Sequence, residues 1–221
     1  AAWPRPPAKD SAPFMPTSIH RDEGYIKFSF AHEAAPAPTH PRLHELMRIR
    51  DDLHEWELIG VLPDGIGYGN VSARIEGTGK FVITGSGTGL KFPIAAAHFC
   101  EVVSFDVAKN SVVCRGPLPA SSESMSHGAI YAARPDAQAV IHIHDRAMFR
   151  LLMREGAACT PADAAFGTPE MARAVGRLAA TLPPVAVMVM AGHEDGLIAY
   201  APDPRSARDA LWDVYARSRR D

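Results

Sequence analysis

The chain has 221 residues, of which 47% are hydrophobic and 22% are charged, and its formal net charge is −2. This composition is typical of one soluble globular domain. Because 23 Lys and Arg balance 25 Asp and Glu, the chain lacks the basic surplus that nucleic acids or anionic membranes attract. The longest uncharged stretch, residues 178–193, contains two prolines and is shorter than the roughly 20 apolar residues of a membrane span. Ten histidines are the unusual feature.

The cysteines and the N-terminal residues bear on the cellular compartment and the domain organisation of the protein. Its three cysteines are odd in number and show no C-x-x-C spacing, so we expect a reduced, cytoplasmic protein. Residues 1–38 are rich in proline and lack the continuous apolar segment of a secretory signal. They predict an extended N-terminal arm, in which residues 24–30 are a candidate strand, followed by a domain at 39–221.

The domain is expected to open with a helix and two hairpins. Thr39 is the expected N-cap of an amphipathic helix that ends before Pro63. One hairpin pairs residues 70–75 with 80–84, and the other pairs 99–105 with 111–114. A glycine-rich loop at residues 84–89 follows the first hairpin directly.

The second half of the chain alternates helices and strands. The pattern predicts helices at residues 121–133, 147–155, 168–180 and from 203 onward, with strands at 137–144, 185–190 and 197–200. Helices interleaved with hairpins favour an α/β layered domain whose sheet is mixed or largely antiparallel.

Two histidines share the apolar strand at residues 137–144. Because side chains alternate along a strand, His142 and His144 are expected on one face, with Cα atoms about 6 to 7 Å apart. A pair so placed favours a shared metal over two separate core histidines. A catalytic zinc usually takes three protein ligands and leaves one position open. His193, after the strand 185–190, is the candidate for the third, and a solvated turn residue is the alternative.

A carboxylate and two hydroxyls stand together at Ser121-Ser122-Glu123, where a helix is expected to begin. In isolation this sequence indicates a serine N-cap and a first-turn carboxylate that complements the helix dipole. Near a metal, the same carboxylate can act as a general base and the helix N-terminus can bind an anion. His127, one turn later, could orient Glu123. The loop at 84–89 is a weaker candidate for an anion cradle.

These motifs occur in a defined order along the chain. Gly69-Asn70-Val71-Ser72 comes first, followed by Ile83 to Gly87, Ser121-Ser122-Glu123, His142-Ile143-His144 and His193. Over roughly residues 43–211, this set resembles the class II aldolase/adducin family. The resemblance implies a three-layer α/β/α sandwich with a mixed, mainly antiparallel central sheet. It also implies a homotetramer with active sites at subunit boundaries.

The resemblance implies roles for individual residues. His142, His144 and His193 match the ligands of Zn²⁺ or a similar divalent metal, and Glu123 matches the catalytic acid/base. The positions that hold the substrate phosphate are Asn70, Ser86, Gly87, Ser121 and Ser122. The implied activity is that of a zinc-dependent lyase, which cleaves a carbon–carbon bond of a small phosphorylated ketose through a metal-stabilised enediolate.

Three alternatives stay open. One is an epimerase, dehydratase or decarboxylase on the same fold, and another is an enzyme that acts on a non-phosphorylated carbonyl acid. The third is a non-catalytic, adducin-like interaction protein.

Two departures from the family pattern concern the site. Members typically have glycine directly after the third histidine, whereas Glu194 and Asp195 intervene here, which makes Asp195 a second candidate for the third ligand. In the phosphate aldolases, a tyrosine after the His-x-His strand protonates the leaving carbanion across the subunit boundary. The corresponding segment here, residues 150–165, is short and has no tyrosine, and its candidate replacements are Cys159, Thr160 and Asp163.

Overall fold

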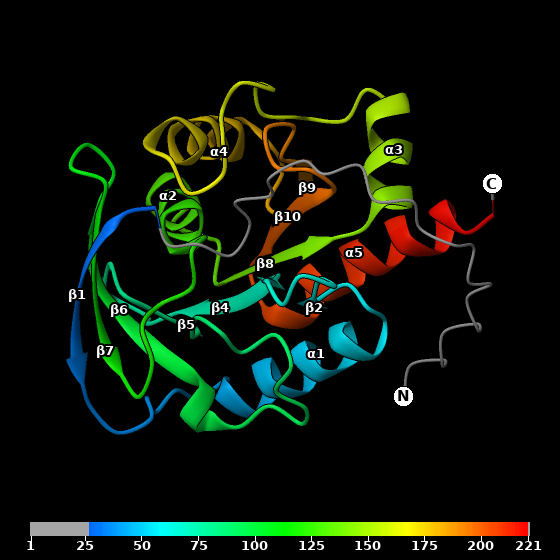
Figure 1. The fold of residues 1–221 in the computed structure, drawn as a ribbon. Coiled ribbons are helices and arrows are strands. Elements are labelled where there is room, and N and C mark those ends of the chain that lie inside the picture. Colours follow the sequence, from blue (N-terminus) through cyan, green and yellow to red (C-terminus); the bar gives the residue numbers. More distant parts are fainter. Residues whose placement is uncertain (1–26, 221) are drawn as a thin grey trace.

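The computed structural model describes residues 27–220, which form a mixed sheet between two layers of helices (Figure 1). The strands of this sheet are β1 (Ser29–Ala34), β4 (Asn70–Arg74), β5 (Phe81–Thr84), β6 (Phe99–Asp106), β7 (Ser111–Gly116), β8 (Ala139–His144), β9 (Ala186–Val189) and β10 (Gly196–Ala201). The helices are α1 (Leu43–Glu55), α2 (Ser124–Ala133), α3 (Arg146–Arg154), α4 (Pro169–Thr181) and α5 (Pro204–Ser218), with a 3-10 turn at Ala96–His98. A separate ribbon pairs β2 (Gly60–Val61) with β3 (Gly67–Tyr68).

The eight strands follow the order β1-β7-β6-β5-β4-β8-β10-β9. Neighbouring strands are antiparallel throughout, except that β1 runs parallel to β7. This arrangement confirms the predicted α/β class and the three-layer α/β/α sandwich with a mainly antiparallel sheet. Each helix and strand predicted for residues 39–221 has a counterpart, whereas the β2–β3 ribbon was not predicted. Among residues 27–220, no helix combines the length and the apolar character that crossing a membrane requires.

The beginning of the described chain differs from expectation. The predicted strand at residues 24–30 lies partly outside the described residues, and β1 begins at Ser29 and pairs with β7 at the edge of the sheet. Of the N-terminal arm predicted at 1–38, residues 1–26 lie outside the described residues. Thr39 does not cap the first helix, because Arg42 precedes its first residue and no side chain caps this end.

The start of α2 also differs from expectation. Its first helical residue is Ser124, and Glu123 occupies the capping position without a side-chain cap. The hydroxyl of Ser121 instead donates to the carbonyl oxygen of Thr84, at 2.6 Å. The expected serine N-cap is therefore wrong, and Ser121 ties the start of α2 to the end of β5.

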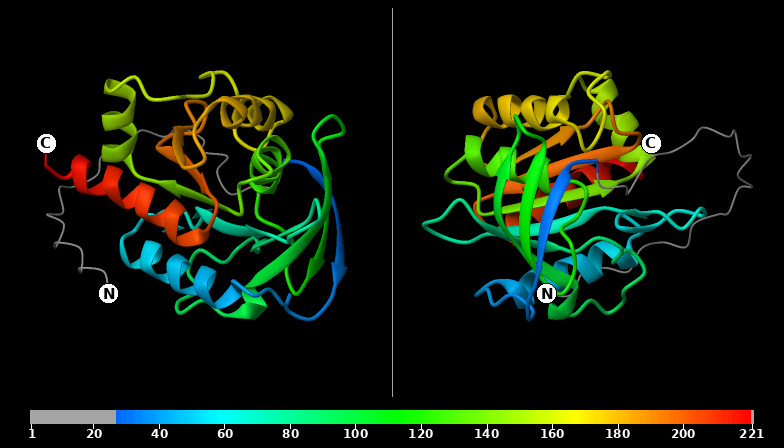
Figure 2. Two further views of the ribbon diagram at one scale, coloured as in Figure 1. Left: turned by 180° about the vertical axis from the view of Figure 1, so that it is seen from behind. Right: turned by 60° about the vertical axis from the view of Figure 1, so that its left-hand side comes forward.

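Each face of the sheet has its own apolar core. Helices α1, α3 and α5 cover one face, and α2 and α4 cover the other, as the view from behind in Figure 2 also shows. Along β8, Ile141 and Ile143 belong to the first core and Val140 to the second. Because side chains alternate along a strand, His142 faces the α2/α4 layer, and it lies opposite Ile141 and Ile143 as the sequence predicts.

Candidate metal and substrate site

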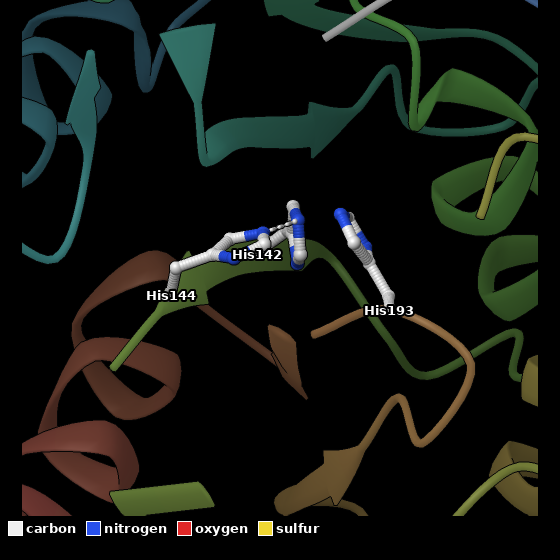
Figure 3. Close-up of side chains that lie close together, drawn as sticks. All are labelled: His142, His144 and His193. Atoms are coloured by element: carbon white, nitrogen blue, oxygen red, sulfur yellow. Dashed lines mark hydrogen bonds between the residues drawn. The ribbon is translucent and has the colours of Figure 1, made fainter. Parts of the chain in front are cut away.

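Strand β8 lies between β4 and β10 and carries two clustered histidines. The side chain of His142 is only 1% exposed, and its Nδ1 lies 2.9 Å from the carbonyl oxygen of Leu197 on β10. Because a carbonyl only accepts hydrogen bonds, Nδ1 carries the proton and the lone pair of Nε2 is the accepting site of the ring. That Nε2 lies 3.0 Å from Nε2 of His144 (Figure 3).

The third histidine comes from the turn between β9 and β10. The ring centroid of His193 lies 4.9 Å from that of His142 and 4.5 Å from that of His144. One nitrogen of each ring can be chosen so that all three lie within 4.8 Å of one another. Figure 3 shows His193 facing the β8 pair from its separate segment. Phe166 stacks on the His193 ring, with centroids 4.6 Å apart, and so restricts the rotation of the imidazole.

Asp195, the second candidate for the third ligand, is not part of this cluster. Its backbone adopts φ 59°, and its carboxylate lies 3.2 Å from Nε of Arg146. The turn closes with two backbone bonds, from His193 N–H to Met190 and from Gly196 N–H to His193. This turn accommodates the two residues inserted before Gly196, so His193 keeps its place beside the pair.

A close backbone approach fixes the turn that carries His193. A Cβ atom on Gly192 would lie 1.9 Å from the carbonyl oxygen of Ala164, so only glycine fits there. On the other side of the turn, the hydroxyl of Thr160 accepts a hydrogen bond from the N–H of Ala191, at 3.0 Å. The segment after α3 therefore holds the third histidine in position.

We expect Gly192→Ala to damage the histidine cluster. The added methyl must push the turn away from Ala164, and overpacking of this kind costs about 1–3 kcal/mol of stability. Displacement of His193 should weaken zinc affinity by about 10- to 100-fold, the range typical of disturbed ligand orientation. Urea unfolding and competition with a chromophoric chelator measure the two effects. Gly79→Ala is the matched control, because a Cβ atom there meets nothing within 4 Å. Wild-type zinc affinity in Gly192→Ala would contradict the expectation.

Glu123 directs one carboxylate oxygen toward the histidines. The side chain is 1% exposed, and Oε2 accepts a 2.6 Å hydrogen bond from the hydroxyl of Ser126. Oε1 lies 3.8 Å from Nδ1 of His193 and has no hydrogen-bond partner among the described residues. A buried carboxylate with one oxygen held and the other open is suited to ligate a metal or to move a proton.

Ser126, rather than His127, orients this carboxylate. Nδ1 of His127 lies 2.7 Å from the hydroxyl of Ser72, which in turn lies 2.8 Å from the hydroxyl of Tyr131. Burial lowers the pKa of His127 to about 3, so this imidazole is neutral at physiological pH. The expectation that His127 orients the carboxylate of Glu123 is therefore wrong. The signal for Ser126 was its position three residues after Glu123, on the same side of a helix.

A polar cavity opens beside Glu123 and His193. The residues expected to hold a phosphate all line it: Asn70, Ser86, Gly87, Ser121 and Ser122. No lysine or arginine is among its lining residues, so hydroxyl, amide and N–H groups would have to bind an anion there. Gly87 adopts φ 73°, a conformation that favours glycine, and Oδ1 of Asn70 is buried without a hydrogen-bond partner among the described residues.

Tyr68, which the sequence did not single out, lies at the border of this cavity. Its ring centroid is 5.6 Å from that of His144, and its hydroxyl donates to the carbonyl oxygen of Glu57, at 3.1 Å. A second hollow, of about 490 Å³, begins on the other side of Tyr68 and His144 and includes Asp145. Both hollows therefore give access to the histidine cluster.

The donor set fits a divalent cation. Burial, together with the neighbouring His144 and His193, holds the pKa of His142 well below its usual value, so this ring is neutral. Neutral imidazole is the form that ligates metals, and three nitrogens with an adjacent carboxylate oxygen suit zinc. The open oxygen Oε1 of Glu123 is the independent sign that a positive partner belongs at this position.

Sequence comparison identifies the family of the chain. The sequence profile described as the Class II Aldolase and Adducin N-terminal domain matches residues 64–216, which is more than half of the chain. The chain belongs to the class II aldolase/adducin family. No curated protein matches it.

Solved structures share the class II aldolase fold. An L-fuculose 1-phosphate aldolase is 21% identical, with a TM-score of 0.60 over 83% of this chain and 85% of that chain. A sugar-phosphate aldolase from Thermotoga maritima is 14% identical, with a TM-score of 0.60 over 79% and 90%. A candidate aldolase, epimerase or decarboxylase from Klebsiella pneumoniae is 17% identical, with a TM-score of 0.59 over 80% and 86%. At these identities, the likeness shows the fold.

This class II aldolase/adducin chain departs from the family pattern in the segment after α3. Of the three candidate replacements for the missing tyrosine, Thr160 is buried and anchors the turn before His193. Cys159 and Asp163 are exposed, and none of the three lines the polar cavity. In this structure the segment supports the third histidine and contributes no side chain to the cavity.

Proposed function

We propose that the protein is a zinc-dependent lyase of the class II aldolase type, which cleaves a carbon–carbon bond of a small phosphorylated ketose. One observation carries the proposal. The open oxygen Oε1 of buried Glu123 lies beside three clustered histidines, at the wall of a cavity lined by hydroxyl and backbone groups. This combination supports proton transfer at a carbon whose neighbouring oxygens are held by a metal.

Each group of residues has a part in this proposal. His142, His144 and His193 hold the divalent cation, which when bound supplies a Lewis acid for the carbonyl and hydroxyl oxygens of the substrate. Glu123 moves a proton at the reacting carbon through Oε1, while Ser126 keeps Oε2 in place. The phosphate is anchored by the cavity residues Asn70, Ser86, Gly87, Ser121 and Ser122.

Family resemblance supports the remaining parts of the proposal. We propose that the protein is cytoplasmic, which is consistent with the free thiols of Cys100, Cys114 and Cys159. We also propose that it assembles as a homotetramer. We also propose that the arm predicted at residues 1–38 joins the domain at 39–221 through β1, which pairs with β7. The proposed partner is a small phosphorylated sugar, with no nucleic acid or membrane involved.

One observation favours a second candidate function. Residues 150–165 contain no tyrosine to protonate a leaving carbanion, and none of their side chains reaches the cavity. An epimerase or decarboxylase on the same fold needs the metal and a proton-transfer group, but not that particular donor. The same cavity could take the carboxylate of a non-phosphorylated carbonyl acid.

Metal analysis followed by a substrate screen tests the proposal. We expect one zinc per chain and metal-dependent cleavage of at least one ketose monophosphate, detected by reduction of the released aldehyde in a coupled assay. Stereochemical inversion without cleavage would identify an epimerase, and release of CO₂ would identify a decarboxylase. A protein that binds no divalent metal and turns over none of these compounds would overturn the proposal.

A further inference from the structure

A buried arginine lies behind the glycine-rich loop of the cavity. Arg50 on α1 is 1% exposed, which is rare for a charged side chain. Its guanidinium donates to the carbonyl oxygens of Thr88, at 2.8 Å, of Gly89, at 3.0 Å, and of Lys91. Asp51 lies 3.4 Å from the same guanidinium. Arg50 itself does not line the cavity.

These contacts determine which way the loop presents its N–H groups. In a trans peptide, a carbonyl and the N–H of the next residue point in opposite directions. By drawing the Thr88 carbonyl to itself, Arg50 therefore turns the N–H of Gly89 away, toward the other side of the loop. Thr88 and Gly89 both line the cavity. Within residues 27–220, no backbone bond uses the N–H of Gly87, Thr88 or Gly89.

The neighbouring contacts keep the loop in this orientation. The hydroxyl of Thr88 donates to the carbonyl of Gly85, at 2.8 Å, so that carbonyl is also held within the loop. Asp51 accepts a 2.9 Å hydrogen bond from the N–H of Ile94, which ties the chain after the loop to α1. The fork of the guanidinium spans three carbonyls at once, which an ammonium group cannot reproduce.

The charge of Arg50 also suits an anion in the cavity. Burial lowers the pKa of Arg50 and Asp51 raises it, but a guanidinium stays charged at physiological pH. Its field reaches the cavity through a medium of low dielectric constant, where it is weakly screened. The cavity lining supplies no cation of its own. The positive charge of Arg50 thus offsets the dipoles of the loop carbonyls that it contacts, and it adds positive potential in the cavity on the other side of the loop.

We propose that Arg50 is the positioning residue of this anion cradle, holding the loop so that the N–H groups of Gly87, Thr88 and Gly89 face a phosphate. The inference rests on the proposed function only in identifying the anion as the phosphate of the substrate. A merely structural role would tie the loop to α1 without altering anion binding. The test therefore measures anion binding and catalysis separately.

The test compares Arg50→Met and Arg50→Lys with the wild type. Binding of inorganic phosphate is measured by ³¹P NMR, and KM and kcat are measured for a ketose phosphate and its unphosphorylated counterpart. We expect Arg50→Met to weaken phosphate binding and raise the KM of the phosphorylated substrate by about 10- to 100-fold, the usual loss for a charge-assisted hydrogen bond. The kcat for the phosphorylated substrate should change little, because the lost phosphate binding is common to the ground state and the transition state. The KM of the unphosphorylated compound should also change little, because it has no phosphate to bind. Arg50→Lys should recover part of the affinity.

Controls separate this inference from the proposed function. Arg173→Met, at an exposed residue of α4 that pairs with Glu170, should bind phosphate like the wild type. If Arg50→Met does not fold, Arg50→Lys carries the test, with at least a threefold loss of phosphate affinity expected. Equal phosphate affinity in the wild type and a folded Arg50 variant, or no phosphate binding by the wild type, would overturn the inference. Phosphate binding that depends on Arg50, without turnover of any ketose phosphate, would support the inference and refute the proposed function.

Discussion

Glu123→Gln should leave the zinc content nearly unchanged while lowering proton exchange at the substrate carbon by at least about 100-fold, as expected for loss of a general acid/base. The glutamine amide has nearly the same shape as the carboxylate, and its oxygen can still accept the hydrogen bond from Ser126. The amide nitrogen that replaces Oε1 cannot take up a proton. Exchange of the substrate hydrogen in deuterated buffer, followed by ¹H NMR, measures the effect directly.

Glu155→Gln provides the matched control for this substitution. Glu155 is an exposed carboxylate at the end of α3 that pairs with Arg217, so its loss should change neither exchange nor cleavage. Exchange at the wild-type rate in Glu123→Gln would refute the proton-transfer role of Glu123. A loss of zinc together with exchange would instead assign Glu123 to metal binding.

His142→Ala should lower zinc affinity by more than about 100-fold. Loss of a residue that only supports a ligand costs up to roughly 100-fold, and His142 is itself a candidate ligand. His142 lies on β8, between β4 and β10, and is one of the three clustered histidines, so the variant keeps only two imidazoles beside the carboxylate of Glu123. Competition with a chromophoric chelator gives the affinity. The thermal midpoint of the wild type should rise with added zinc, and that of the variant should not.

His44→Ala is the control for this second substitution. His44 is exposed on α1 and does not belong to the histidine cluster, so zinc affinity and the zinc-dependent rise in thermal midpoint should both be preserved. If His142→Ala kept the zinc affinity of the wild type, the metal would have to lie elsewhere. The clustered histidines would then be a packing feature of the α2/α4 layer.

Strand β8 shows why much of the site could be predicted from the sequence. An apolar strand buried on both faces has a strict period of two, so burying Ile141 and Ile143 on one side leaves His142 and His144 on the other. The ordered motifs then predicted the family and the cavity residues. Those residues are contributed by strand ends and loops, whose relative positions follow from the fold.

Site residues that could not be predicted from the sequence owe their roles to tertiary packing. Ser126 and His127 both lie about one turn after Glu123, and only the packing of α2 against β4 directs His127 to Ser72. Arg50 lies far from the glycine-rich loop in the sequence, so no local pattern could connect them. Thr39 illustrates a different failure. Thr39 is a good capping residue, but the helix begins four residues later, at Leu43, and Arg42 occupies the capping position.

The origin of the three histidines from two separate segments has a thermodynamic consequence. His142 and His144 belong to the middle of the sheet, whereas His193 stands on the turn that follows β9. An ion bound by all three would close a ring in the chain that contains α3 and α4. Such a cross-link lowers the conformational entropy of the unfolded chain. Bound metal would therefore make residues 145–192 unfold more cooperatively with the central strands. The histidine cluster would then stabilise the fold whenever metal is bound, in addition to its part in the reaction.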